Sequence, residues 1–265
     1  MSTTERVKLS HNGPIAHVVL SRAEKRNALD QAMLDAIAEV IEQLKEARET
    51  RVVVLSGDGE AFCAGLDFFS FASMLQNPES LDFMTRTHDD ANLFQQVSVG
   101  WRDLPMPVIT ALHGVAFGGG FQIMLGADIR VAAPDTRFSV MEAKWGLVPD
   151  MGGMVLMPQV ARQDVIRRLT YTAEVFTAQQ ALDWGIVSEL SDDPVARAFE
   201  LAEAIAMRNP ESIRAAKRLI SETWNADPAE TLMAESIAQK AVLGRPNQRE
   251  AVLANFEKRA PNFKD

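Results

Sequence analysis

Two short glycine-containing segments hold the residues whose types and spacing are best suited to chemistry. They are Ala64–Asp67 and Gly118–Gly120, and Gln122 stands two residues after the second. Glycine adopts positive φ readily and has no side chain to hold a ligand at a distance. A helix that begins in such a segment also has backbone N–H groups without partners, and these attract negative charge. Each segment is therefore a place where bare backbone can stabilise an anion.

A developing oxyanion is the kind of anion that such backbone can hold. Two converging N–H donors stabilise the oxyanion of a thioester enolate, and loss of one such donor in other enzymes costs about 3 kcal/mol. Metal chemistry fits less well, because His11, His17, His88 and His113 lack metal-ligand spacing and Cys63 is a lone thiol. The glycines also lack the spacing of a dinucleotide-binding fingerprint.

Each glycine segment follows an apolar run that can position it. The run Val52–Leu55 precedes the first segment, and Pro107–Phe117 leads directly into the second; both predict buried strands. The apolar residues Ile123–Leu125 predict that a helix begins at the second segment. A strand, a glycine turn and a helix start would place backbone N–H groups at the end of a sheet.

The hydrophobic pattern predicts alternating strands and helices in the first two thirds of the chain and mainly helices in the last third. Residues 7–20 predict a hairpin, and Asp30 is a candidate N-cap for a helix that ends near Arg51. Further strands are expected at 129–133, 138–141 and 186–187, and helices at 93–104, 177–184, 194–207, 210–225, 228–243 and 248–258. The expected fold class is an α/β core followed by a helical segment.

The composition limits the kinds of partner. The chain has 265 residues and a net charge of −9, which argues against nucleic acid because phosphate binding needs a basic face. Its beginning is polar and charged, and no stretch approaches the roughly 20 apolar residues needed to span a bilayer. A single cysteine allows no intrachain disulfide, as is usual in a reducing compartment. We therefore expect a cytoplasmic protein without a membrane or nucleic-acid partner.

The glycine segments and their flanks resemble the crotonase superfamily, which is the enoyl-CoA hydratase/isomerase family. The resemblance rests on Ala61–Asp67, His113–Gly120 and Phe138–Gly153, with further matches at Arg22–Leu29 and Phe256–Arg259. It implies an α/β fold in which repeated ββα units form a crotonase-type spiral core at residues 1–195. It also implies that a helical segment at residues 196–265 forms oligomer contacts and completes the CoA site. The expected assembly is a homotrimer or a dimer of trimers.

The resemblance implies an acyl-CoA thioester as the substrate, with CoA as part of that substrate and no separate cofactor. The two oxyanion donors fall on the backbone N–H groups of Leu66 and Gly119. Glu142 matches an acid/base carboxylate of the family, whereas Gln122 stands where the family's hydratases carry a second one. A glutamine cannot exchange a proton near neutral pH, so the usual hydration by two carboxylates is put in doubt.

Asp150 offers a different second carboxylate. The dienoyl-CoA isomerases of the family are similar here, with a Glu and an Asp at the spacing of Glu142 and Asp150. In those enzymes the two carboxylates move a proton between distant carbons of the acyl chain. Two carboxyls in an apolar site differ in proton affinity, so that one can act as base and the other as acid. The match is incomplete, because those isomerases have an Asp where this chain has Gln122.

Other side chains are candidates for contacts with the rest of the substrate. The resemblance assigns CoA contacts to Arg22, Lys25, Arg26, the backbone at Ala64 and Asp67, and Lys258 reaching from a neighbouring subunit. Candidates to line the acyl site are Phe68, Phe69, Phe71, Trp145, Met151, Met154 and Met157, for which ordinary packing is an equal alternative.

Double-bond isomerisation of an acyl-CoA, of the dienoyl-CoA type, is the predicted function. Hydration of a 2-enoyl-CoA is the first alternative, with Glu142 positioning water and Gln122 orienting it. A CoA-thioester binding protein without catalysis is the second alternative, motivated by Gln122 in place of an expected acid.

Overall fold

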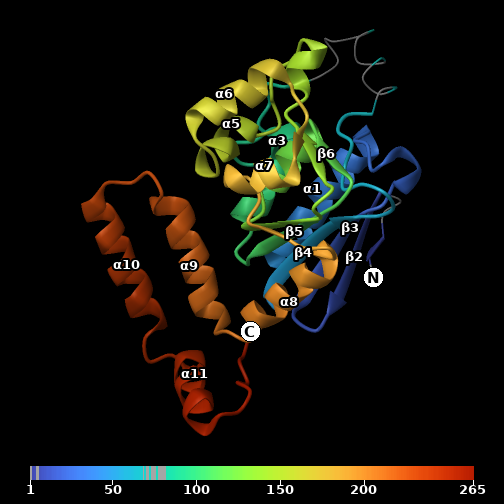
Figure 1. Ribbon diagram of the computed structural model, residues 1–265. Helices are drawn as coiled ribbons and strands as arrows, with labels where there is room; N and C mark the ends of the chain where they lie inside the picture. Colours follow the sequence, from blue (N-terminus) through green and yellow to red (C-terminus); the bar gives the residue numbers. More distant parts are fainter. Residues whose placement is uncertain (1, 4–5, 68, 70–71, 73–75, 77–81) are drawn as a thin grey trace.

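The structure is a computed structural model of the chain. It describes residues 2–3, 6–67, 69, 72, 76 and 82–265. The predicted acyl-site residues Phe68 and Phe71 lie outside the described residues. Over the described part, the chain forms a larger and a smaller sheet with helices around them, and a helical arm at the C-terminal end (Figure 1).

The larger sheet forms the centre of the core. Its strands, in spatial order, are β1 (Ser2–Thr3), β2 (Val7–Asn12), β3 (Ile15–Leu20), β4 (Val52–Gly57), β5 (Val108–Leu112), β7 (Ile129–Ala132) and β10 (Glu189–Leu190). β1, β2 and β3 pair antiparallel, which confirms the predicted hairpin, and every later neighbour pairs parallel. All residues of β5 are buried, because a parallel strand is covered on both faces.

The apolar run Pro107–Phe117 is two strands in different sheets, and the prediction of a single strand is wrong. The smaller sheet contains β6 (Val115–Phe117), β8 (Arg137–Ser139) and β9 (Phe176–Thr177). The chain leaves β5 after Leu112 and turns at Gly114, where φ is +61° and a Cβ would overlap the Glu60 carbonyl oxygen. A run of apolar residues indicates burial but does not report a change of sheet.

The strand predicted at 186–187 is also wrong. Ile186 and Val187 are buried, and both donate their N–H groups to the Ala181 carbonyl, which closes the turn after a helix. The strand β10 begins after this turn. Burial and β-branched residues are common to both structures, so the pattern does not distinguish a buried turn from a strand.

Helices cover both faces of the larger sheet. Those before the arm are α1 (Gln31–Glu46), α3 (Leu93–Asp103), α4 (Gly119–Leu125), α5 (Gly153–Leu156), α6 (Gln163–Thr172), α7 (Ala178–Asp183) and α8 (Pro194–Ala206), with short 3-10 turns η1 (Ala23–Lys25), η3 (Glu142–Trp145) and η4 (Met157–Gln159). Asp30 caps α1 by accepting from the Met33 N–H at 2.9 Å, as predicted, although α1 ends earlier than Arg51. α8 packs Ala198 and Ala202 against the face of the sheet opposite to α1.

The C-terminal arm consists of α9 (Pro210–Thr223), α10 (Pro228–Val242) and α11 (Pro246–Glu257), and it projects away from the sheets (Figure 1). Proline suits the first position of each helix, where an N–H has no helical partner. The predicted division between residues 195 and 196 falls within α8, which packs on the sheet. The arm carries exposed apolar side chains at Ile220, Trp224, Leu232, Met233, Ile237, Leu243, Val252, Leu253 and Phe256.

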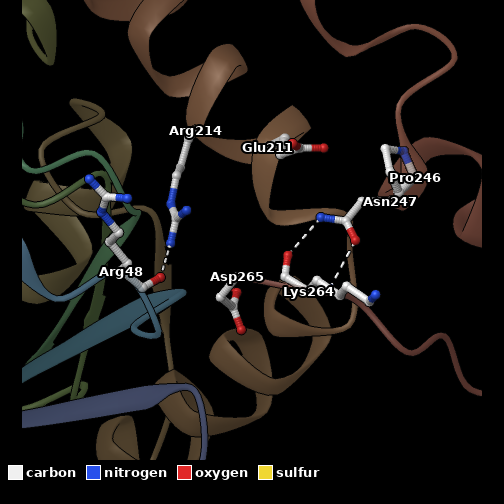
Figure 2. A pocket seen from close by; sticks show the side chains of 7 residues that line it. All are labelled: Arg48, Glu211, Arg214, Pro246, Asn247, Lys264 and Asp265. Carbon is white, nitrogen blue, oxygen red and sulfur yellow. Dashed lines mark hydrogen bonds between the residues drawn. The ribbon is translucent and has the colours of Figure 1, made fainter.

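Polar contacts join the arm to the core around a cleft of about 430 Å³ (Figure 2). The cleft is lined by Arg48, Glu211, Arg214, Pro246, Asn247, Lys264 and Asp265. Arg214 donates to the Arg48 carbonyl, and Asn247 exchanges two hydrogen bonds with the Lys264 backbone at 2.7 and 2.9 Å. Neither glycine segment contributes to this lining. The cleft therefore lies between the arm and the core and is separate from the site that the glycine segments predict.

Three observations on the described residues concern metal ligands, the cysteine and the length of the helices. They include no cluster of three or more His, Cys, Asp or Glu side chains placed to hold a metal ion. Cys63 is buried, and burial raises the pKa of its thiol to about 12, which makes it a poor nucleophile. None of the described helices has both the length and the apolar character needed to cross a bilayer.

Candidate active site

Pairing between the first glycine segment and β6 brings the two glycine segments together. Cys63 donates to the Val115 carbonyl and accepts from the Phe117 N–H, both at 3.0 Å. A Cβ on Gly65 would lie 2.6 Å from the Phe117 carbonyl oxygen and 3.7 Å from the Gly119 nitrogen. The φ of Gly65 is +88°, in the left-handed region that favours glycine. Both the close approach and the backbone conformation therefore require a glycine here.

The backbone N–H groups of Leu66 and Gly119 are available to a ligand. Neither donates in the backbone hydrogen bonds found over the described part of the chain. Gly119 is the first residue of α4, where an N–H has no partner inside the helix and carries positive partial charge. The two predicted oxyanion donors thus belong to adjoining segments.

Leu29 holds the first glycine segment on its other side. Its N–H donates to the Gly65 carbonyl at 2.8 Å, and its carbonyl accepts from the Asp67 N–H at 2.9 Å. Leu66 lies between these two bonds, so the direction of its own N–H is set by the backbone on both sides. This contact was not predicted from the sequence, because it joins residues that are far apart in the chain.

Glu142 is a buried carboxyl at the start of η3, where the chain has just left β8. Its side chain faces the second glycine segment, since a Cβ on Gly118 would lie 3.6 Å from Oε1. Oε1 accepts a hydrogen bond from Nε2 of Gln122 at 2.6 Å, and Oε2 is buried without a partner among the described residues. Burial raises the pKa of Glu142 to about 7; the residue's own backbone N–H and the Gln122 donor oppose this rise, and the charge of Asp150 adds to it. A carboxyl of this kind can both accept and donate a proton near neutral pH.

Asp150 is connected to Glu142 through Gln122. The N–H of Met151, the next residue, donates to Oε1 of Gln122 at 2.9 Å, and Gln122 donates to Glu142. Asp150 is exposed, yet the protein atoms packed beside its carboxyl partly desolvate it and raise its pKa. Both carboxyls therefore have raised pKa values, and they are near enough for the charge of Asp150 to act on Glu142.

These features occur in a chain that matches a known family over nearly its whole length. Residues 10–265 match the family described as enoyl-CoA hydratase/isomerase. The chain belongs to this family. The protein is therefore an enzyme of the crotonase superfamily, and the family resemblance predicted from the sequence is confirmed.

Relatives of this enoyl-CoA hydratase/isomerase family member carry different activities in their names. The mitochondrial Delta(3,5)-Delta(2,4)-dienoyl-CoA isomerase of Mus musculus is 33% identical over 210 residues, which are 77% of this chain and 64% of the mouse protein. Carnitinyl-CoA dehydratase of Salmonella arizonae is 32% identical over 268 residues, covering 98% of this chain and 99% of that protein. These two relatives are thus named for different reactions, an isomerisation and a dehydration.

A solved structure confirms the α/β crotonase fold. The crystal structure of enoyl-CoA hydratase from Bacillus anthracis superposes with a TM-score of 0.86 at 28% identity, covering 98% of this chain and 99% of that chain. The expected cytoplasmic location stays a prediction, since the name of the mouse relative places that protein in the mitochondrion.

The basic residues predicted to contact CoA differ in burial and in ion pairing. Arg22 is mostly buried and forms ion pairs with Asp67 at 2.9 Å and with Asp30 at 3.5 Å, so its charge is compensated within the protein. Lys25 and Arg26 are exposed on the same loop. In this family member, Arg22 therefore holds Asp67 in place, and its neighbours present charge to the surroundings.

The remaining predicted CoA contacts lie on two separate parts of the molecule. Ala64 donates its N–H to the Arg26 carbonyl at 2.9 Å, so the first glycine segment and the basic loop adjoin. Lys258 is exposed and is the C-cap residue of α11, a helix that lies in the arm, far from this loop (Figure 1). A contact of Lys258 with the same CoA would therefore have to come from another subunit.

The described candidates to line the acyl site differ in burial and in their distance from the glycine segments. Met151 is buried against the second glycine segment, since a Cβ on Gly119 would lie 2.7 Å from its sulfur. Met157 is buried in the core, whereas Trp145 and Met154 are half exposed. Met151 thus lies beside a predicted oxyanion donor, and Met157 serves ordinary packing.

Asn27 organises the basic loop, a role that the sequence analysis missed. The residue is fully buried, has φ of +55°, and donates its side-chain amide to the carbonyls of Asp58, Ala61 and Phe62 at 2.8–3.1 Å. Its Oδ1 accepts from the Arg22 N–H at 2.8 Å. Asparagine tolerates the left-handed conformation and bonds nearby backbone, so its position at the end of a polar loop was the available signal.

Proposed function

We propose that this enzyme moves a carbon–carbon double bond in an acyl-CoA, as in dienoyl-CoA isomerisation. The observation that carries the proposal is the pair Glu142 and Asp150, both with raised pKa and joined through Gln122. Gln122 itself exchanges no proton, so the pair supplies the acid and the base. The 33% identity to the mouse protein named as a dienoyl-CoA isomerase is in keeping with this choice.

The proposed reaction begins with the thioester oxygen between the N–H groups of Leu66 and Gly119. One carboxylate removes a proton from the acyl chain, and the electrons of the broken C–H bond shift through the double bonds to this oxygen. The resulting enolate is stabilised by the two N–H donors. The other carboxyl donates its proton to a distant carbon, and the electrons return to form the shifted double bonds. One proton is lost and one is gained, so the product is an isomer of the substrate.

A comparison of two substrates tests the proposal. We expect turnover of a 3,5-dienoyl-CoA and little of crotonyl-CoA, with both reactions followed by absorbance. Asp150→Asn should lower turnover of the dienoyl-CoA by about 10²-fold or more, because an amide cannot take part in the second proton transfer. Asp135→Asn is the matched control, since Asp135 is likewise exposed and follows a proline. Turnover of crotonyl-CoA alone would rule out the isomerase.

Hydration of a 2-enoyl-CoA is the second candidate, favoured by the dehydratase and hydratase names of relatives that align with nearly the whole chain. Glu142 would then activate water. Gln122 has one N–H left to orient that water, because its oxygen and its other N–H are engaged. If acyl-CoA binds in calorimetry but neither substrate is converted, the binding-protein alternative gains instead.

We also propose where CoA is held and how the subunits assemble. The exposed Lys25 and Arg26 would bind the anionic end of CoA, beside the backbone of Ala64 and Asp67, and Lys258 would reach the same CoA from a neighbouring subunit. Exposed apolar side chains on the arm support a homotrimer or dimer of trimers, since large apolar surfaces mark protein contacts. Light scattering should give three or six times the chain mass, and a monomer would contradict this assembly.

A further inference from the structure

Gln122 is a fully buried side chain that connects the parts of the active site. It lies on the first turn of α4, next to the second glycine segment. Its Oε1 accepts from the N–H groups of Met151 and Gly153, each at 2.9 Å, and its Nε2 donates to Glu142 at 2.6 Å. Three segments that are distant in the sequence are therefore joined by one amide.

The chemistry of the neighbouring groups decides which way this amide points. Backbone N–H groups only donate, so the atom facing Met151 and Gly153 must be the amide oxygen. Both lone pairs of that oxygen are then engaged, and the NH₂ group is directed toward Glu142. The packing is close, since a Cβ on Gly153 would lie 2.7 Å from Oε1 of Gln122. The amide remains a fixed donor toward Glu142 at every pH, because it does not titrate.

A fixed donor makes the two carboxyl oxygens of Glu142 different. Oε1 accepts from Gln122, so a proton placed on Oε1 would compete with that hydrogen bond. Oε2 is buried and has no partner among the described residues. The proton of the neutral acid is therefore favoured on Oε2, and Oε2 is also the oxygen left free to accept one.

We propose that Gln122 is a positioning residue that reserves Oε2 of Glu142 for proton transfer. The same amide accepts from the Met151 N–H, so it also holds the backbone next to Asp150. This inference rests on the proposed function in one respect, namely that Glu142 moves a proton. The proposed role requires an amide, because only an amide both accepts from the two backbone N–H groups and donates to Glu142 at every pH.

Gln122→Met tests the proposal, because methionine has nearly the same length but no donor. The pKa of Glu142, read by ¹³C NMR of labelled carboxyls with E142Q as the blank, should rise by about one pH unit or more. We expect kcat to fall about tenfold or more while KM changes less than about threefold, and the acidic limb of the pH–rate profile should move with the pKa. Gln96→Met is the matched control, since Gln96 is also buried and donates to a carboxylate, Glu42, at 3.1 Å.

Gln122→Glu is a second variant of the same size that cannot donate while it is ionised. It should also raise the pKa of Glu142, because two carboxyls would share the space. An unchanged pKa of Glu142 in the folded variants overturns the positioning role, even if the enzyme is active. If the pKa rises as expected but the wild type converts no acyl-CoA, the positioning role stands and the proposed function fails.

Discussion

Replacing Glu142 by glutamine should lower kcat for the acyl-CoA reaction by about 10²- to 10⁴-fold, the range of proton transfer by a positioned side chain. Glutamine has the same shape as the glutamic acid, and the site is buried, so packing is preserved while proton transfer is lost. KM should change little, because the thioester oxygen is held by Leu66 and Gly119 instead. Steady-state kinetics on whichever substrate the wild type converts gives both constants, and an unchanged kcat would remove Glu142 from the mechanism.

The pH profile of the wild type belongs to the same prediction. If ionised Glu142 is the base, kcat/KM should rise with pH and level off above about 7, because burial raises the pKa of Glu142 to about 7. The residual activity of E142Q should lack this limb. A wild-type profile that is flat from pH 5 to pH 8 would contradict the assignment.

A check without substrate follows from the stability of the fold. The pKa of Glu142 is raised from 4.5 to about 7, so the folded protein holds this proton more tightly than the unfolded chain. The stability that this proton provides is present below about pH 4.5 and is lost as pH rises through 7. Above this window E142Q should therefore unfold with a free energy ~3 kcal/mol higher than the wild type, as measured by denaturant titration.

Gly65→Ala should reduce kcat/KM by about 10²- to 10³-fold, the effect of losing one oxyanion donor. The added Cβ would lie 2.6 Å from the Phe117 carbonyl oxygen at a φ of +88°, so the segment must move. The Leu66 N–H is attached to the Gly65 carbonyl carbon and must move with it. We expect kcat to carry most of the loss, because the donor acts mainly on the enolate that forms during the reaction.

Gly13→Ala is the matched control for this prediction. Gly13 also has positive φ, +55°, but no heavy atom beyond its two chain neighbours lies within 4 Å of the position of its Cβ, and it is exposed in the β2–β3 turn. The control should lose about 1 kcal/mol of stability and keep its activity. If Gly65→Ala loses stability but keeps kcat, the Leu66 N–H is not an oxyanion donor.

Local patterns were sufficient for many of the helices and strands. The alternation and turn residues of 7–20 predicted the hairpin, and Asp30 predicted the start of α1, because torsions and caps depend on neighbours in the sequence. The same is true of the glycine segments, where residue type alone permits positive φ and close approach. The family motif then supplied the roles of Leu66, Gly119 and Glu142, which remain predictions for this chain.

The surroundings of the site residues depend on contacts between distant parts of the chain, which the local sequence pattern does not contain. Local pattern did not report that Pro107–Phe117 changes sheet at Gly114, or that Arg22 is neutralised by Asp67, because both depend on distant backbone and charge. The raised pKa of Glu142 likewise comes from burial, which is a property of the packed fold.

The glutamine in place of an expected acid is the clearest case of this division. From the sequence, Gln122 indicated only a missing proton carrier. In the structure its oxygen is occupied by two backbone N–H groups, and its nitrogen therefore faces Glu142. The sequence by itself determined the chain's family, most of its elements and the residue types at the site. Only the tertiary structure decided which atoms face each other, because the direction of a buried side chain depends on partners that are far away in the chain.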